Sequence, residues 1–327
     1  MTKIAAALAR LVLVPLACAG SAALAQAYPD RPVVMVVPYA AGGPTDVLAR
    51  LFARSLSESL KQQFVVENTP GAAGVIGTTR VIKSKPDGYT LLVSQNSAVA
   101  PVAALYKTPP FDPMRDLEPV ARVADVPFIY MTRKNAPVNN MKEFVDWVKA
   151  NDRKLNFGTG GVGTVSLGLV VLNSVLGTNV TGVPYKGTNL ALNDMIAGTL
   201  DLMADQPTSS IQHIQAGSVK AIAITSARRS AALPDLPSVI ELGYPGLEIN
   251  IWNGIWAPAG TPPAVINRLH EHVAAALGTD AVKKTMASLG AELPVGDSSK
   301  PEAFKAFIGR EVARWTMLFR AAGVQPQ

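Results

Sequence analysis

Strand-like and helix-like hydrophobic patterns alternate along the first part of the chain. Residues 33–37 form a continuous apolar run, as expected for a strand that is buried on both faces. Over residues 44–60 the apolar side chains recur at helical spacing, which predicts an amphipathic helix. Further strands are expected at 64–66 and 89–93, with a helix at 78–83. This alternation is typical of a parallel sheet with helices on both faces.

The pattern restarts near residue 125, which indicates a second α/β lobe. Its expected strands are 128–131, 155–157, 180–185, 200–204 and 219–225, and its expected helices are 141–150, 165–176 and 189–197. The extended run at 247–256 lies where the chain is expected to cross back. Two amphipathic helices, 263–277 and 301–319, follow it and are expected to pack on the first lobe. The predicted division is lobe 1 at 26–124 with 252–327 and lobe 2 at 125–251.

The first 25 residues have the pattern of a secretory signal peptide. Lys3 and Arg10 precede a short apolar run, and Ala23 and Ala25 supply small residues at positions −3 and −1 of a cleavage site. One alternative is an N-terminal membrane anchor, for which the apolar run is short. Another is a lipoprotein modified at Cys18, which Pro15 before it fits poorly. We therefore expect cleavage after Ala25 and export to the periplasm.

Cleavage changes the composition in two ways. The 327-residue chain has a formal net charge of +6 and one cysteine, Cys18. The remaining 302 residues have a net charge of +4 and no thiol, so they offer no disulfide, thiolate nucleophile or cysteine metal ligand. An exported protein without disulfides is consistent with a periplasmic protein that has a large core. The basic residues are dispersed, so nucleic acid is not an expected partner.

The loop at 38–46 joins the first buried strand to the first predicted helix. Pro44 suits the first helical turn, and Gly42 and Gly43 leave the backbone bare just before it. Amide groups at such a position can bind an anion. In open α/β sheets, ligands bind at this end of the strands. We therefore expect the loop to contact a ligand, although a tight turn that merely requires glycine has the same pattern.

Asp46 lies in the first turn of that helix and has two interpretations. It can cap free amide groups of its own turn, or it can accept a hydrogen bond from the ligand. A carboxylate at close range would oppose an anion. The anion is therefore expected at Ala41–Gly43, with Asp46 turned inward or bridged by water.

A second glycine-rich segment, 158–164, matches G-x-G-x-x-G at Gly158, Gly160 and Gly163. A dinucleotide site also needs an acidic residue about 20 positions later to hold the ribose. Residues 153–193 contain no Asp or Glu, so a dinucleotide is not expected. The bare loop and the hydroxyl groups of Thr159 and Thr164 instead predict contact with a small anion, although a simple turn has the same pattern.

Signatures of an enzyme are scarce. His270 and His272 are two residues apart, so their rings cannot share a helix face as in H-E-x-x-H. Ser166 lacks the first glycine of a nucleophile elbow. No P-loop pattern is present. We expect no catalytic residues, no cofactor and no metal site.

Several short motifs together give the chain a family resemblance. Their order and spacing are specific, and they cover essentially the whole mature chain: YPDRP at 28–32, the loop 39–46, EN at 67–68, GAAG at 71–74, PDGYTL at 86–91, VPYKG at 183–187, GTLD at 198–201, the segment 221–225, and LPS at 236–238. In this pattern the chain resembles the substrate-binding proteins of tripartite tricarboxylate transporters, also called the Bug family. The usual Pro-Gly-Gly of the first loop is Ala41-Gly42-Gly43 here, which keeps both glycines.

The resemblance implies a type II periplasmic-binding-protein-like α/β fold, with two lobes, mixed or parallel sheets and two crossings between the lobes. It implies a monomer that closes on a small carboxylate, such as a di- or tricarboxylate, an acidic amino acid or an aromatic acid, and delivers it to integral membrane transporter subunits. Tyr39 and Trp252 could flank an aromatic ring. The expected ligand-binding residues are Tyr39, Ala41, Gly42, Gly43, Thr45, Asp46, Gln95, Asn96, Ser97, Thr159, Gly160, Gly163, Thr164, Tyr185, Lys186 and Asp205.

Two other functions compete with transport. A sensor subunit that passes ligand occupancy to a receptor would need the same closing lobes, so the sequence does not separate it from a transporter subunit. A periplasmic hydrolase would need a nucleophile–base pair, and no pair in the sequence has the required spacing.

Overall fold

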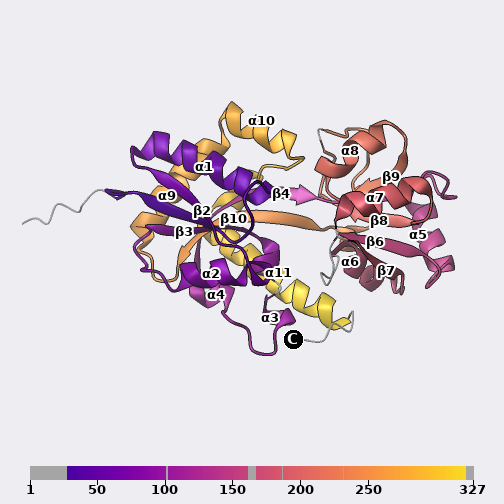
Figure 1. Ribbon diagram of the computed structural model, residues 1–327, viewed down its shortest axis with the longest axis horizontal. Coiled ribbons are helices and arrows are strands. Elements are labelled where there is room, and N and C mark those ends of the chain that lie inside the picture. Colours follow the sequence, from indigo (N-terminus) through magenta and orange to yellow (C-terminus); the bar gives the residue numbers. More distant parts are fainter. Residues whose placement is uncertain (1–27, 101, 161–166, 186, 231, 322–327) are drawn as a thin grey trace, which may run out of the picture.

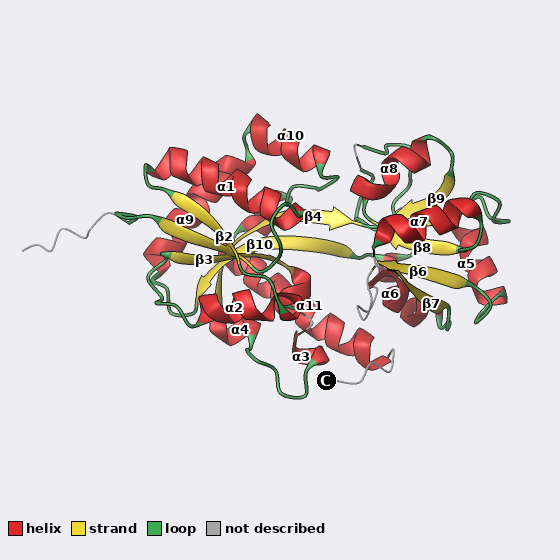
Figure 2. Cartoon of the chain, viewed as in Figure 1, coloured by secondary structure: helices red, strands yellow, loops and turns green. Residues whose placement is uncertain are grey.

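Two five-stranded sheets organise the computed structural model, which describes residues 28–100, 102–160, 167–185, 187–230 and 232–321. We call the sheet with strand order β2-β1-β3-β10-β4 and its helices the first lobe, and the sheet with order β7-β6-β8-β5-β9 and its helices the second lobe. Helices flank both sheets (Figure 2). Within the described residues, no helix has the length and apolarity needed to cross a membrane.

The first lobe contains both ends of the described chain. Its strands are β1 (Val33–Val37), β2 (Phe64–Asn68), β3 (Thr90–Gln95), β4 (Leu117–Pro127) and β10 (Asn250–Pro258). Its helices are α1 (Pro44–Leu60), α2 (Val75–Ile82), α3 (Val102–Leu105), α4 (Pro113–Asp116), α9 (Pro263–Leu277), α10 (Asp280–Ser288) and α11 (Pro301–Ala321). β1 pairs in parallel with β2 and β3, whereas β10 runs antiparallel to β3 and β4.

Alternate residues of β1 enter two different cores. Val33, Met35 and Val37 pack in the cluster that also holds the apolar stripes of α1 and α9. Val36 faces the other way and joins a cluster with Val81 of α2 and with α11. Because a strand turns successive side chains to opposite faces, a continuous apolar run is what a doubly covered strand requires.

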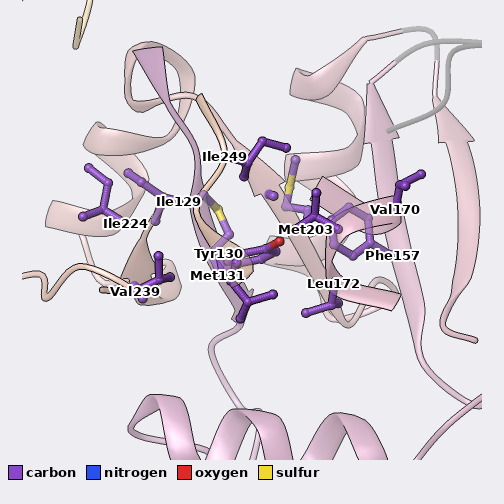
Figure 3. Close-up of a cluster of buried hydrophobic side chains, with 14 of the residues drawn as sticks. Ile129, Tyr130, Met131, Phe157, Val170, Leu172, Met203, Ile224, Val239 and Ile249 are labelled. Carbon is purple, nitrogen blue, oxygen red and sulfur yellow. The ribbon is translucent and has the colours of Figure 1, made fainter. Parts of the chain in front are cut away.

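The second lobe follows the same plan. Its strands are β5 (Ile129–Arg133), β6 (Asn156–Gly160), β7 (Thr181–Tyr185), β8 (Leu202–Asp205) and β9 (Val219–Ile224). Its helices are α5 (Met141–Ala150), α6 (Leu167–Leu176), α7 (Thr188–Ala197) and α8 (Pro207–Gln215). Figure 3 shows its buried side chains, with Tyr130 and Phe157 among them. The predicted two-lobe α/β fold with mixed sheets is confirmed.

Two short links and one helix connect the lobes. β4 leads into β5 through Phe128, and Ile249 leads back into β10; in Figure 1 β4 runs toward the second lobe and the antiparallel β10 runs away from it. Thr225 ties the links together, because its buried hydroxyl accepts from the Phe128 amide at 2.8 Å and donates to the Ile249 carbonyl at 2.5 Å. The helix α11 contacts both β4 and α6, so it spans both lobes, whereas it was expected to pack on the first lobe alone.

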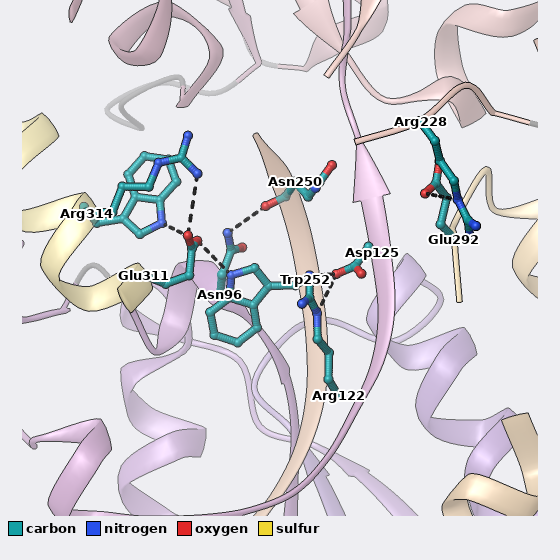
Figure 4. A network of polar contacts seen from close by, with 10 residues as sticks. Asn96, Arg122, Asp125, Arg228, Asn250, Trp252, Glu292, Glu311 and Arg314 are labelled. Atoms are coloured by element: carbon teal, nitrogen blue, oxygen red, sulfur yellow. Dashed lines mark hydrogen bonds and ion pairs between the residues drawn. The ribbon is translucent and has the colours of Figure 1, made fainter. Parts of the chain in front are cut away.

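A network of polar contacts, in part buried, surrounds these links (Figure 4). Glu311 of α11 accepts hydrogen bonds from the indole N–H groups of Trp252, at 3.0 Å, and Trp315, at 3.1 Å. Arg122 pairs with Asp125 within β4, and Arg228 of the second lobe lies 3.8 Å from Glu292 of the first. Polar side chains of both lobes therefore meet beside the crossing strands.

Candidate ligand-binding site between the lobes

In the first lobe, the carboxyl ends of β1 and β3 lie on the side that faces the second lobe. The strand register establishes this, because Gln95 at the end of β3 pairs with Asn253, three residues from the start of β10. The start of β10 is where the chain arrives from the second lobe. The loop 38–43 and the short helix Asn96–Ala98 follow β1 and β3 at this edge. The predicted first-lobe residues therefore lie together at this edge.

Asp46 is buried and holds the first loop in shape. Its Oδ2 accepts from the Gly42 amide at 2.9 Å and from Arg50 Nε at 2.9 Å, while its Oδ1 accepts from Asn68 Nδ2 at 2.9 Å. The Asn68 amide also donates to the Tyr39 carbonyl, at 3.2 Å. The carboxylate is thus turned into the protein, as the inward alternative expected.

These hydrogen bonds change the acidity of Asp46. Burial acts to raise the pKa of the carboxyl, but the hydrogen bonds from Arg50, the Gly42 amide and Asn68 outweigh it, so the pKa falls below its usual value. The side chain is therefore ionised at neutral pH. An anion at this loop has to bind beside a negative charge that the protein already compensates.

The Gly42 amide is occupied by Asp46, so it is not the open anion donor that the sequence suggested. Gly42 has a φ of +85°, which favours glycine. Gly43 has an ordinary φ of −75° and stands at the N-cap position of α1. A Cβ built on Gly43 would meet only the Ala40 carbonyl, at 3.7 Å. Gly43 therefore offers a bare backbone at the start of α1, with Ala41 exposed beside it.

Hydroxyl and amide groups line the rest of this edge. The Tyr39 hydroxyl lies 3.3 Å from Ser94 Oγ and 3.2 Å from Ser97 Oγ. Burial raises the pKa of this phenol, so it stays protonated. Asn96 donates to the Asn250 carbonyl at 3.1 Å, and its own Oδ1 is buried with no partner among the described residues. Gln95 is half-buried next to them.

In the second lobe, the carboxyl ends of β6, β7 and β8 share one edge that faces the first lobe. Asp205 pairs with Ile129, the first residue of the second lobe after the link at Phe128. β6 is parallel to both β7 and β8, and Gly160 pairs with Tyr185. Gly160, Tyr185 and Asp205 thus lie at corresponding strand ends, opposite the edge of the first lobe.

The second-lobe side chains have partners within their own lobe. Thr159 donates to the Val183 carbonyl at 3.3 Å, and Tyr185 donates to Asp194 at 2.7 Å. Asp205 is buried and accepts from the Ser209 hydroxyl at 2.5 Å. Burial raises the pKa of Asp205, and the hydrogen bonds from Ser209 and the Gln206 amide offset this only in part. Protonation of Asp205 is therefore easier than for a free aspartate.

Three predicted residues, Gly163, Thr164 and Lys186, lie outside the described residues. The second glycine segment also begins differently from the prediction. Gly158 and Gly160 belong to β6 rather than to a loop, and a Cβ on Gly158 would lie 2.4 Å from Leu200 Cδ2. Gly158 thus permits close packing inside the lobe, which is a reason for glycine that the motif did not reveal.

Trp252 does not flank a ligand ring. Its side chain is 1% exposed and packs edge-on against Phe304 and Phe307, with ring centroids 5.7 and 5.3 Å apart. Trp256 is buried beside it. Both indoles belong to the packing between β10 and α11.

Two asparagine side chains that hold the first-lobe edge together were not predicted from the sequence. Asn253 is buried in β10 and accepts from Thr45 Oγ1 at 3.3 Å, which fixes the start of α1 to the crossing strand. Asn68 ends β2 and holds Asp46. Asparagines in otherwise apolar strands were the available signal, because a buried amide needs a partner.

The two edges carry polar groups of several kinds. In the part of the chain that the structure describes, no group of three His, Cys, Asp or Glu residues is arranged to hold a metal ion. The edges offer backbone amides, hydroxyls and amide side chains, which suit the recognition of a small polar ligand.

Comparison with known proteins assigns the family. The model of the tripartite tricarboxylate transporter family receptor, TctC, matches residues 48–324. The chain belongs to this family. Among solved members, the periplasmic binding protein BugD is 43% identical, with a TM-score of 0.72 over 92% of this chain and 100% of BugD. The predicted periplasmic-binding-protein fold and the resemblance to Bug proteins are thus confirmed.

Two solved relatives contain ligands. MatC from Rhodopseudomonas palustris, with bound malate, is 34% identical, with a TM-score of 0.71 over 89% of this chain and 99% of MatC. Rpa4515 from R. palustris, with adipate, is 33% identical, with a TM-score of 0.73 over 92% of this chain and all of that chain. Both bound molecules, malate and adipate, are dicarboxylates.

Proposed function

We propose that the protein captures a small carboxylate between its two lobes and delivers it to a tripartite membrane transporter. The observation that carries the proposal is the pair of facing strand edges, with the bare Gly43 backbone on one and Asp205 on the other. Malate and adipate in two family members support a ligand with two carboxylates. The ligand-binding residues are those expected from the sequence, with Gly42 and Asp46 acting through the shape of the loop.

In this proposal the protein is a binder rather than an enzyme. Asp205 and Ser209 form a carboxylate–serine pair at the site, and no histidine among the described residues joins them. Without a base that can take the serine proton, the pair lacks the arrangement for nucleophilic catalysis. A ligand should therefore leave the site unchanged.

We further propose that the protein is exported to the periplasm by cleavage after Ala25 and acts there as a monomer. The predicted lobe boundaries, 124/125 and 251/252, fall within β4 and β10. Because these strands carry the two crossings, we infer that the lobes rotate about the ends of β4 and β10.

A thermal-shift screen of mono-, di- and tricarboxylic acids on residues 26–327 tests the proposal. At 100 times the dissociation constant, a ligand adds about 2.7 kcal/mol to the free energy of unfolding. The expected result is a rise in Tm of a few degrees for one group of related acids. Uncharged amides of the same acids serve as controls. No shift with any acid, or an equal shift with the amides, would contradict carboxylate binding.

A further inference from the structure

A cavity lies between the lobes, at the side where β4 and β9 form the edges of their sheets. Its volume is about 660 Å³. The loop after β9 lines it from the second lobe with Arg228, Arg229 and Pro234, and α10 with the following segment lines it from the first lobe. It shares no residue with the candidate ligand site. Its volume is within the range of cavities that bind small molecules.

The lining combines an apolar floor with basic side chains. The apolar part includes Met286 and Leu293, and the basic part is Arg228, Arg229 and Lys283. Glu292 is the only carboxylate in the described lining. This combination suits a ligand with an apolar body and one negative group.

Two of the basic side chains are free to turn toward such a ligand. Arg228 lies 3.8 Å from Glu292 and Lys283 lies 3.9 Å from Asp280, and both cations are more than half exposed. Contacts this long and exposed hold a side chain weakly. Arg229 differs, because it donates to Glu241 at 2.8 Å and to the Pro234 carbonyl at 3.2 Å. Arg228 and Lys283, one from each lobe, are therefore the groups available to an anion.

We propose that this cavity is a second binding site, for a small organic anion with an apolar body. Because its walls come from both lobes, an occupant favours the present arrangement of the lobes over one in which they separate. The site thus provides a way to bias the lobes without occupying the carboxylate site. Gly290 marks where the lobes touch, since a Cβ there would lie 2.6 Å from Pro207 Cβ at the start of α8.

The test is a fluorescence titration with 8-anilinonaphthalene-1-sulfonate, an anion with an aromatic body that brightens in apolar surroundings. We expect saturable binding to the wild type. The double variant Arg228→Ala/Lys283→Ala should bind about tenfold more weakly, because a charged hydrogen-bond partner is lost. Lys284→Ala is the matched control, since Lys284 is the exposed neighbour of Lys283 outside the lining, and should bind as the wild type does.

A second variant blocks the cavity by size rather than charge. Ala287 is an exposed lining residue on α10, so Ala287→Trp fills the space without entering the core, and it should abolish the signal while the melting temperature is kept. Saturating adipate should leave the dye bound. The proposal is overturned by an absence of saturable binding, by equal affinity in all variants, or by displacement of the dye by adipate with no effect of the cavity variants.

Discussion

Asp46 shows how one buried carboxylate can hold a loop in shape. Its carboxylate accepts hydrogen bonds from the Gly42 amide, Arg50 and Asn68. These bonds fix the backbone of the loop that precedes α1. Its charge is compensated by these donors. A nearby ligand anion therefore meets less repulsion than an isolated aspartate would cause.

Asp46→Asn should lower stability in a pH-dependent way. Asn keeps one acceptor but loses the ion pair with half-exposed Arg50, so we expect a loss of about 1–2 kcal/mol at pH 7. The pKa of Asp46 is lowered in the folded state, so its stabilising effect is present above the ordinary value of 3.8 and is lost as pH falls below it. Urea unfolding of both proteins from pH 7 to pH 3 should show the difference shrinking. A difference that stays constant would contradict the role given to Asp46.

Gly43→Ala tests whether the loop meets the ligand. The added methyl group has space and an allowed backbone conformation, so the free energy of unfolding should change by less than about 0.5 kcal/mol. If the ligand lies against this backbone, the methyl group should weaken binding at least about tenfold. Calorimetry measures the affinity. Gly309→Ala in α11, where an added Cβ would lie at an ordinary 3.5 Å from Met114, is the control and should bind as the wild type does. Equal affinity in Gly43→Ala and wild type would remove the loop from the site.

At the scale of elements, the apolar patterns predicted most helices and strands. The helices α1, α5 and α9 have the predicted bounds because their caps and stripes are local signals. β4, α8 and α10 were missed. β4 contains Pro119, Arg122 and Asp125; Arg122 and Asp125 pair with each other, and the Asp125 backbone bonds to the distant Glu292 backbone. The candidate site also has a part that the sequence predicts and a part that it does not. Its glycine loop is a local pattern, whereas Asn68 and Asn253 act through tertiary contacts.

The contact between α11 and β10 depends on Glu311. Glu311→Leu would leave the indole N–H groups of Trp252 and Trp315 buried without an acceptor, at a cost of about 1–3 kcal/mol each. We expect the free energy of unfolding in urea to fall by about 2–5 kcal/mol. Glu302→Leu, at an exposed position of the same helix, is the matched control and should change it little. A Glu311 variant as stable as the control would contradict this role.

At the scale of the whole molecule, two short links and α11 connect the lobes, and one buried apolar cluster includes side chains of both lobes and of α11. A rotation of the lobes about the links therefore has to change the packing of α11 against α6. The indoles of Trp252 and Trp256 are buried in the first lobe, so their fluorescence is a poor measure of lobe movement. Solution scattering measures it directly.

A saturating carboxylate should reduce the radius of gyration, because a ligand that contacts both edges favours the closed arrangement. Scattering curves of the free and the saturated protein check this. Gly43→Ala at the same ligand concentration is the control, because its weaker binding leaves fewer molecules with a bound ligand. Tight binding with identical curves would show that the lobes are already closed around the site.

The central claim is that the protein binds a small carboxylate and releases it unchanged. Calorimetric titration of residues 26–327 with the acid selected by the screen, followed by chromatography of the recovered acid, tests it most directly. We predict one binding event per chain, near micromolar affinity or tighter, and full recovery of the intact acid. Absence of binding heat at several temperatures, or recovery of a chemically altered acid, would contradict it.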